Sequence, residues 1–152
     1  MYSGFLLIHS WLRWAVLLLG LAALVRSLTR AQRPWTPTDQ KVGRLFTAAL
    51  DLQFLLGAIL YFALSPFTTA ALSDFGAAMG NSGLRFWAVE HAFGMVVGMA
   101  LAHIGRARIA KAPTDARRHR LALIFYGLAL LVIVISIPWP GRPNGRPMFR
   151  LQ

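Results

Sequence analysis

The stretch FLLIHSWLRWAVLLLGLAALV, residues 5–25, decides the fold class because it is almost entirely apolar and long enough to cross a bilayer. A membrane-spanning helix needs about 20 such residues. Three further apolar stretches follow it, at residues 45–64, 86–104 and 121–137. The sequence therefore predicts an all-α fold: an integral membrane four-helix up-down bundle over residues 1–140.

Residues 141–152 form a different kind of segment. They are rich in Pro, Gly and Arg and have no apolar period. We expect an extended tail, ordered only if a partner holds it. At the other end of the chain, no basic region precedes residues 5–25, so this stretch is expected to be the first membrane helix and not a cleaved signal.

Composition and charge distribution agree with a membrane protein. The chain is 57% hydrophobic and 14% charged, whereas about a quarter of residues are charged in soluble domains. The net charge of +11 comes mainly from Lys and Arg in the connections 26–44 and 106–120. Basic connections stay on the cytoplasmic side, and the connection 65–84 lacks Lys and Arg. We therefore expect a multi-pass protein of the bacterial inner (cytoplasmic) membrane with both termini on the outer side.

Several function classes are excluded. The chain has no cysteine, so disulfides, thiolate metal sites, iron–sulfur clusters and covalently attached haem are ruled out. No nucleic-acid-binding motif accompanies the basic residues. No P-loop, GxSxG, HExxH or dinucleotide-binding glycine pattern is present. A small transporter is disfavoured because the sequence has neither an inverted repeat nor a pair of broken helices.

The connections carry helix signals. Thr36 or Thr38 is expected to cap the second helix, and Thr114 precedes the fourth. The connection 65–84 is long for a hairpin and is expected to lie as a short amphipathic helix over the outer end of the bundle. Tryptophans mark that same end and predict an interfacial aromatic belt: Trp11, Trp14, Trp87 and Trp139.

His9 and His91 are the main candidate functional residues. Each lies a short distance inside the outer end of its apolar stretch. Ionisable residues within a membrane are functional-site hypotheses by default. Two imidazoles on facing helices suit the iron of a haem, so His9 and His91 are predicted to be the metal ligands of one b-type haem. Another tetrapyrrole, a metal ion, or a structural or quinone-contacting role remain alternatives.

Arg13 follows His9 by one helical turn and lies within the same apolar stretch. It needs an anionic partner or a path to the interface. A haem propionate would be one partner. Glu90 would be another, and it could instead handle protons for a quinol near the outer surface.

Glycines share the faces of both histidines. Gly20 lies on the stripe of His9, and Gly94 and Gly98 lie on the face of His91. Gly94 and Gly20 are expected to make room for a flat cofactor. The alternative for Gly94 and Gly98 is a helix-packing seam of small residues.

The inner half of the sequence has a second group of polar residues. Asp51 and His103 are expected at similar depth, as a hydrogen-bonded pair or as an inner proton entry point. His119 lies among arginines and is expected to be solvated at the interface. A second inner site formed by His103 and His119 is a further alternative.

Three strings carry a resemblance to a known family: HSWLRW at residues 9–14, LQFLLGAILYF at residues 52–62 and RFWAVEH at residues 85–91. They resemble a family of small four-helix bacterial membrane proteins, loosely labelled cytochrome b-like, whose activity is not firmly assigned. The family's HSxLRW and VEH patterns include His9, Arg13, Glu90 and His91. The resemblance excludes the tail, which leaves partner binding open.

The sequence thus predicts a membrane b-type cytochrome-like subunit that transfers single electrons with the quinone pool. Its expected cofactors are haem b and a quinone or quinol. It is too small for a full electron path, so its expected partners are the bilayer and other subunits of a respiratory or photosynthetic complex, contacted through residues 141–152. It would be at most the electron-transfer subunit of an oxidoreductase complex. The alternative is a haem-free accessory subunit that stabilises or docks such a complex.

Overall fold

The structure is a computed structural model that describes residues 1–142 and 144–150. Most of the described residues are helical, and no strand occurs among them. Four helical segments of this part of the chain are long and apolar enough to cross a membrane: Tyr2–Thr29, Pro37–Leu64, Ser82–Ala110 and Asp115–Ser136. The four apolar stretches predicted from the sequence are therefore confirmed as helices, and most of them extend several residues beyond their apolar centres.

The long segments contain different helix types. The first and last are the uninterrupted α-helices α1 (Tyr2–Thr29) and α7 (Asp115–Ser136). The second is α2 (Pro37–Ile59) continued by the wider π-helical turn η1 (Leu60–Leu64). The third joins α5 (Ser82–Arg85), the π-helical turn η2 (Phe86–Glu90) and α6 (His91–Ala110). The short helices α3 (Pro66–Ser73) and α4 (Phe75–Gly80) lie between the second and third segments.

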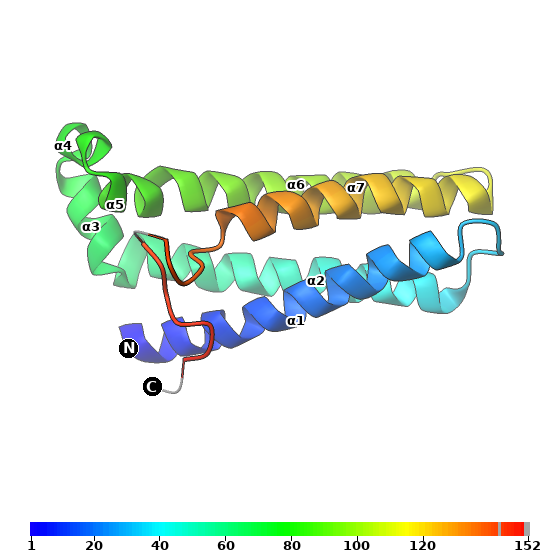
Figure 1. The fold of residues 1–152 in the computed structure, drawn as a ribbon, viewed down its shortest axis with the longest axis horizontal. Coiled ribbons are helices and arrows are strands. Elements are labelled where there is room, and N and C mark those ends of the chain that lie inside the picture. The colour runs from blue at the N-terminus through cyan, green and yellow to red at the C-terminus, as the bar shows by residue number, and fades with distance from the viewer. Residues whose placement is uncertain (143, 151–152) are drawn as a thin grey trace.

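Figure 1 shows the four long helices lying lengthwise beside one another. The α1–α2 and α6–α7 connections lie at one end, and α3 to α5 and both chain ends lie at the other. We call the second of these the terminal end. Helix α6 packs most extensively against α7, and α1 packs against α2 and α7, whereas α2 and α6 contact each other less.

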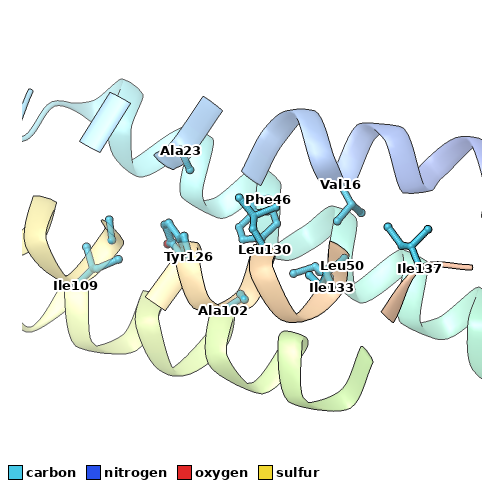
Figure 2. Packing of buried hydrophobic residues seen from close by; sticks show 12 residues of the cluster. Val16, Ala23, Phe46, Leu50, Ala102, Ile109, Tyr126, Leu130, Ile133 and Ile137 are labelled. Carbon is cyan, nitrogen blue, oxygen red and sulfur yellow. The ribbon is translucent and has the colours of Figure 1, made fainter. Parts of the chain in front are cut away.

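The core lies between the four long helices α1, α2, α6 and α7. Phe46 is fully buried and meets Tyr126 edge to face, with 5.4 Å between ring centroids. Figure 2 shows Phe46 beside Leu130. A Cβ placed on Gly20 would lie 2.7 Å from Leu130 Cδ2 and 2.8 Å from Phe46 Cε2. Gly20 therefore makes room for core side chains and not for a cofactor, which corrects the expectation for this residue.

Local side chains set the helix starts at the opposite end. Thr36, and not Thr38, caps α2: its hydroxyl accepts from the Asp39 N–H, and the Asp39 carboxylate accepts from the Thr36 N–H. Pro37 then begins the helix, where its missing N–H costs nothing. Thr114, where the sequence predicted the start of the fourth helix, caps α7.

The connection 65–84 covers the terminal end with three short helices, α3, α4 and α5, where the sequence predicted one. Ser65 caps α3 by accepting from the Thr68 N–H. Ala71 and Ala78 are buried together with Ala88 of η2, so these small residues let the short helices pack closely on the third long segment.

The described residues of the tail, 141–142 and 144–150, contact the chain's own helices, and the role of a partner in ordering them stays a prediction. The Arg142 guanidinium donates to the Ile135 carbonyl at 2.7 Å, and the Arg146 N–H donates to the Pro138 carbonyl at 2.9 Å. Phe149 stacks on Trp14 with 5.3 Å between centroids. In Figure 1 the orange-red tail passes back across the terminal end toward α1. Residues 143, 151 and 152 of the predicted tail lie outside the described residues.

Candidate functional site

His9 and His91 line the same cavity. It has a volume of about 440 Å³ and lies between α2 and α6, with His9 reaching it from α1. This volume falls within the range of about 300–1,000 Å³ typical of ligand and cofactor pockets. Two smaller cavities at the terminal end also have both histidines among their lining residues. The structure thus brings together the two imidazoles that the sequence singled out.

The lining of the main cavity is almost entirely apolar. Apart from the two histidines, Gln53 and the Tyr61 hydroxyl supply its polar side-chain atoms. The apolar residues come mainly from facing positions of α2 and α6: Leu50, Phe54, Ala58, Phe62, Val89, Phe93, Met95, Val96 and Met99. The cavity therefore suits a largely apolar group with few polar contacts.

The two π-helical turns shape the terminal end of this cavity. The turn η2 ends directly before His91, and η1 lies on the opposite wall. The Tyr61 hydroxyl of η1 donates to the Ala88 carbonyl of η2 at 2.7 Å and ties the two turns together. Such turns frequently occur at functional sites. Here η2 sets the direction in which His91 projects at the start of α6.

The hydrogen bond between His91 and α7 fixes which nitrogen of the neutral imidazole carries the proton. His91 Nδ1 lies 2.8 Å from the Ser136 carbonyl oxygen. Because a carbonyl only accepts, Nδ1 carries the proton, and in the neutral ring Nε2 keeps its lone pair. Metal-binding histidines are commonly oriented by this kind of second hydrogen bond. His91 is therefore prepared to act as a ligand through Nε2.

His9 has a different environment. Within the described part of the chain, His9 Nδ1 and Gln53 Oε1 are buried and lack a hydrogen-bond partner. The Gln53 amide donates to the His9 backbone carbonyl at 3.0 Å, which links α2 to α1. A buried polar atom without a partner costs about 1–3 kcal/mol. These two atoms are therefore available to a ligand or a water molecule.

Gly57 makes room for the His9 ring. A Cβ on Gly57 would lie 3.2 Å from His9 Cε1, closer than most real contacts. The sequence reasoning assigned no role to Gly57. The signal was its position one turn after Gln53, one of the few polar residues in the second apolar stretch.

Arg13 and Arg146 make the terminal end of the site cationic. The Arg13 guanidinium donates to the Met148 carbonyl at 2.7 Å and lies 5.2 Å from the Trp14 ring. Arg146 lies 5.1 Å from the Trp87 ring, and both arginines line a smaller cavity together with His9 and His91. In the described structure no carboxylate lines any of these cavities. Arg146 was missed because it belongs to a tail that was expected to lie apart.

Glu90 is not the partner of Arg13. Its carboxylate pairs with Arg85 at 2.8 Å, and both side chains are exposed. The expected Arg13–Glu90 pair is therefore wrong. Glu90 lies five positions after Arg85 along the chain, at the end of the wide turn η2.

Gly94 does not open toward the cavity. A Cβ there would collide with Ser136 Oγ of α7, and a Cβ on Gly98 would lie 2.7 Å from Ile133 Cγ1. The structure therefore supports the alternative of a helix-packing seam between α6 and α7. The expectation that Gly94 makes room for a cofactor is corrected accordingly.

The two inner histidines, His103 and His119, have different neighbours. His103 Nε2 and Asp51 Oδ1 lie 2.6 Å apart, so the predicted pair is confirmed. His119 is fully buried and packs against Trp35 with 4.9 Å between centroids, so the expectation of a solvated residue is wrong. Its arginine neighbours point elsewhere around α7. His103 is therefore joined to Asp51, and no bond joins it to His119 in the described structure.

The site thus consists of two imidazoles, the Gln53 side-chain amide and two guanidinium groups around apolar cavities. Among residues 1–142 and 144–150, no group of three or more His, Cys, Asp or Glu side chains is placed to hold a metal ion. The donor set instead suits a metal that brings most of its own ligands. Comparisons of this chain with protein families, with characterised proteins and with solved structures return no match.

Proposed function

We propose that the chain is an integral membrane protein that holds one b-type haem between His9 and His91. It would exchange single electrons with the quinone pool as a subunit of a larger respiratory or photosynthetic complex of the bacterial inner membrane. One observation carries the proposal. Two histidines from separate helices line one apolar cavity, and the Ser136 carbonyl leaves Nε2 of His91 free to bind a metal.

The residues around the cavity fit a haem. His9 and His91 would be its axial ligands, and Gly57 gives the His9 ring its space. Arg13 and Arg146 supply positive charge where the carboxylates of a haem need it. A bound haem would accept and release single electrons. The protein would exclude water and hold the group near one surface.

The distribution of charge supports the proposed orientation of an up-down bundle. The basic connections α1–α2 and α6–α7 lie together at one end, opposite both chain ends. Positive connections favour the cytoplasm, so the terminal end and its cavity would lie at the outer surface. The aromatic residues Trp11, Trp14 and Trp87 at that end fit an interfacial belt.

The test is the spectrum of the purified protein. After production with ample haem, the reduced-minus-oxidised absorption should contain a b-type α-band. His9→Ala and His91→Ala should each abolish it, because each removes one axial ligand. His119→Gln is the matched control, since this histidine lies outside the cavity, and it should keep the band. A colourless unsubstituted protein would refute haem binding.

A haem-free accessory subunit is the second candidate, and one observation favours it. The His91–Ser136 bond joins α6 to α7 and would stabilise a bundle without any cofactor. Docking through the tail is less well supported, because Arg142 and residues 144–150 pack on the chain's own terminal end. In this case the purified protein would be colourless, and His91→Ala would lower its unfolding temperature more than His9→Ala.

A further inference from the structure

Asp51 of α2 and His103 of α6 form a polar pair on an apolar surface. Their side chains are 51% and 40% exposed, and 2.6 Å separates Oδ1 from Nε2. Asp51 is the one charged residue between Leu45 and Leu64. Exposed apolar residues surround the pair on both helices, among them Leu55 and Ile104.

This exposure is costly in a membrane. If the bundle spans the bilayer as proposed above, the face of α2 and α6 that carries the pair lies toward lipid. Ionisable side chains at such depth normally face the bundle interior or a polar partner. The pair neutralises part of its own charge, but its exposed nitrogen and oxygen atoms still need hydrogen-bond partners. A group other than a lipid tail is therefore expected to cover it.

The pair also lies at one end of the main cavity. Asp51 is one turn from Phe54, and His103 is one turn from Met99, and both of these residues line the cavity. Along the second long segment the cavity lining runs from Leu50, next to Asp51, to Phe62, a span of about 18 Å at 1.5 Å per residue. Phe62 and Phe93 at its margin are 77% and 68% exposed, so the cavity opens sideways between the two helices.

We propose that Asp51 and His103 form the head-group site of a quinone or quinol that enters from the lipid between α2 and α6. The inference rests on the proposed function and names the place where the quinone binds. A molecule with one polar ring and an apolar chain matches an isolated polar pair next to an apolar groove. The head group lies one turn beyond the cavity, so it adjoins the histidine site without filling it.

The bond between the two residues explains why both quinone states fit. His103 Nε2–H donates to the Asp51 carboxylate, which leaves Nδ1 for the ligand. In the neutral ring, Nδ1 accepts a hydrogen bond from a quinol hydroxyl. In the protonated ring, Nδ1–H donates to a quinone carbonyl. Asp51 orients the ring through this bond.

The experiment uses the full chain in lipid nanodiscs and an azido-benzoquinone with a short alkyl chain as a photoreactive probe. Light should attach the probe to peptides that contain Asp51 or His103, and decylubiquinone should compete. The apparent Kd should rise about tenfold in Asp51→Asn, the effect of losing about one strong hydrogen bond. It should rise further in the double variant Asp51→Leu/His103→Leu.

The double variant separates binding from folding. Replacing an ion pair by apolar residues is often neutral or stabilising, so this variant should keep its unfolding temperature while it loses the probe. Asp115→Asn is the matched control: it removes the carboxylate of another partly exposed pair, with Arg118, and should bind normally.

Three results would overturn the inference: an unchanged Kd in the double variant, attachment of the probe only at other positions, or a second polypeptide covering the pair. Repeating the labelling in the His9→Ala/His91→Ala background distinguishes the two proposals. Labelling that persists there supports the quinone site even if the protein binds no haem. Labelling that is absent there and present in the unsubstituted chain would overturn an independent quinone site.

Discussion

At the scale of single residues, the environments of the two candidate ligands differ because their neighbours differ. His91 has its Nδ1 proton placed by the Ser136 carbonyl, whereas within the described structure His9 Nδ1 is buried without a partner. His9 depends instead on space, which Gly57 provides. One ring is therefore held by a hydrogen bond, and the other is held by packing against the backbone of α2.

Gly57→Val should displace the His9 ring. The new Cβ would lie 3.2 Å from His9 Cε1, and the two added methyl groups would crowd the ring further. Overpacking of this kind costs about 1–3 kcal/mol. We expect a lower unfolding temperature and the loss of most of the α-band, measured on protein purified with ample haem. Gly4→Val is the control, because nothing lies within 4 Å of a Cβ there. An intact α-band in Gly57→Val would show that the ring position does not depend on this glycine.

At the scale of helices, small residues decide which pairs pack closely. Gly94, Gly98 and Gly105 of α6 all face side chains of α7, and these two helices have the most extensive contact in the bundle. Helices α2 and α6 lack such a seam along the cavity and stay further apart. Helix α6 thus packs closely against α7 on one side and leaves the cavity toward α2 on another.

Gly105→Ala should weaken the α6–α7 seam. A Cβ at this position would collide with Phe125 Cβ, which is too close to its own backbone to move away. We expect a loss of about 1–3 kcal/mol in the free energy of unfolding, seen as a lower unfolding temperature in detergent. Gly127→Ala is the matched control within a long helix, since its nearest neighbour is Leu24 Cδ1 at 3.4 Å. That control should be neutral or stabilising by up to about 1 kcal/mol. Equal effects of both substitutions would argue against the seam.

Thr36→Ala should destabilise the start of α2. Its hydroxyl caps the helix and also binds Asp39, which pairs with Arg26 of α1 at 2.8 Å. Loss of such a cap costs about 1 kcal/mol. Thr38→Ala, an exposed position two residues away, should change the free energy of unfolding much less. Thermal unfolding of both variants under the same conditions provides the comparison, and a larger effect of Thr38→Ala would contradict the assigned cap.

At the scale of the whole molecule, the two ends of the bundle are chemically different. One end contains the basic connections, and the other contains the aromatic residues, the short helices and the folded-back tail. Both histidines lie toward the terminal end, where they line a small cavity together with Arg146 and Trp87. This polarity gives the molecule a defined direction if it spans a membrane.

Single cysteines test that direction without interference, because the native chain has no cysteine. In intact spheroplasts, a membrane-impermeant maleimide should label Ser73→Cys of α3. It should label Gln32→Cys of the α1–α2 connection only after permeabilisation. The unsubstituted chain should stay unlabelled throughout. The opposite pattern would invert the proposed orientation, and early labelling of both positions would refute the single crossing of the membrane, by Pro37–Leu64, between them.

Patterns along the chain predicted the all-α class, the four long apolar helices, the start of the fourth helix near Thr114 and the Asp51–His103 pair. They also indicated that His9 and His91 belong together. These features depend on apolar length, on the chemistry of a few adjacent residues, or on depth along a helix. All three are properties that can be counted along the chain.

Only the tertiary structure decided what each residue faces. It turned Gly20 and Gly94 toward core side chains, buried His119 beside Trp35 and brought the tail back across the terminal end. It also gave Arg13 a backbone carbonyl in place of Glu90. The physical reason is that the neighbours of a side chain depend on how far each helix is rotated about its axis. That rotation results from the packing of all the helices together, and wide turns such as η2 shift it by an amount that periodicity along the chain does not contain.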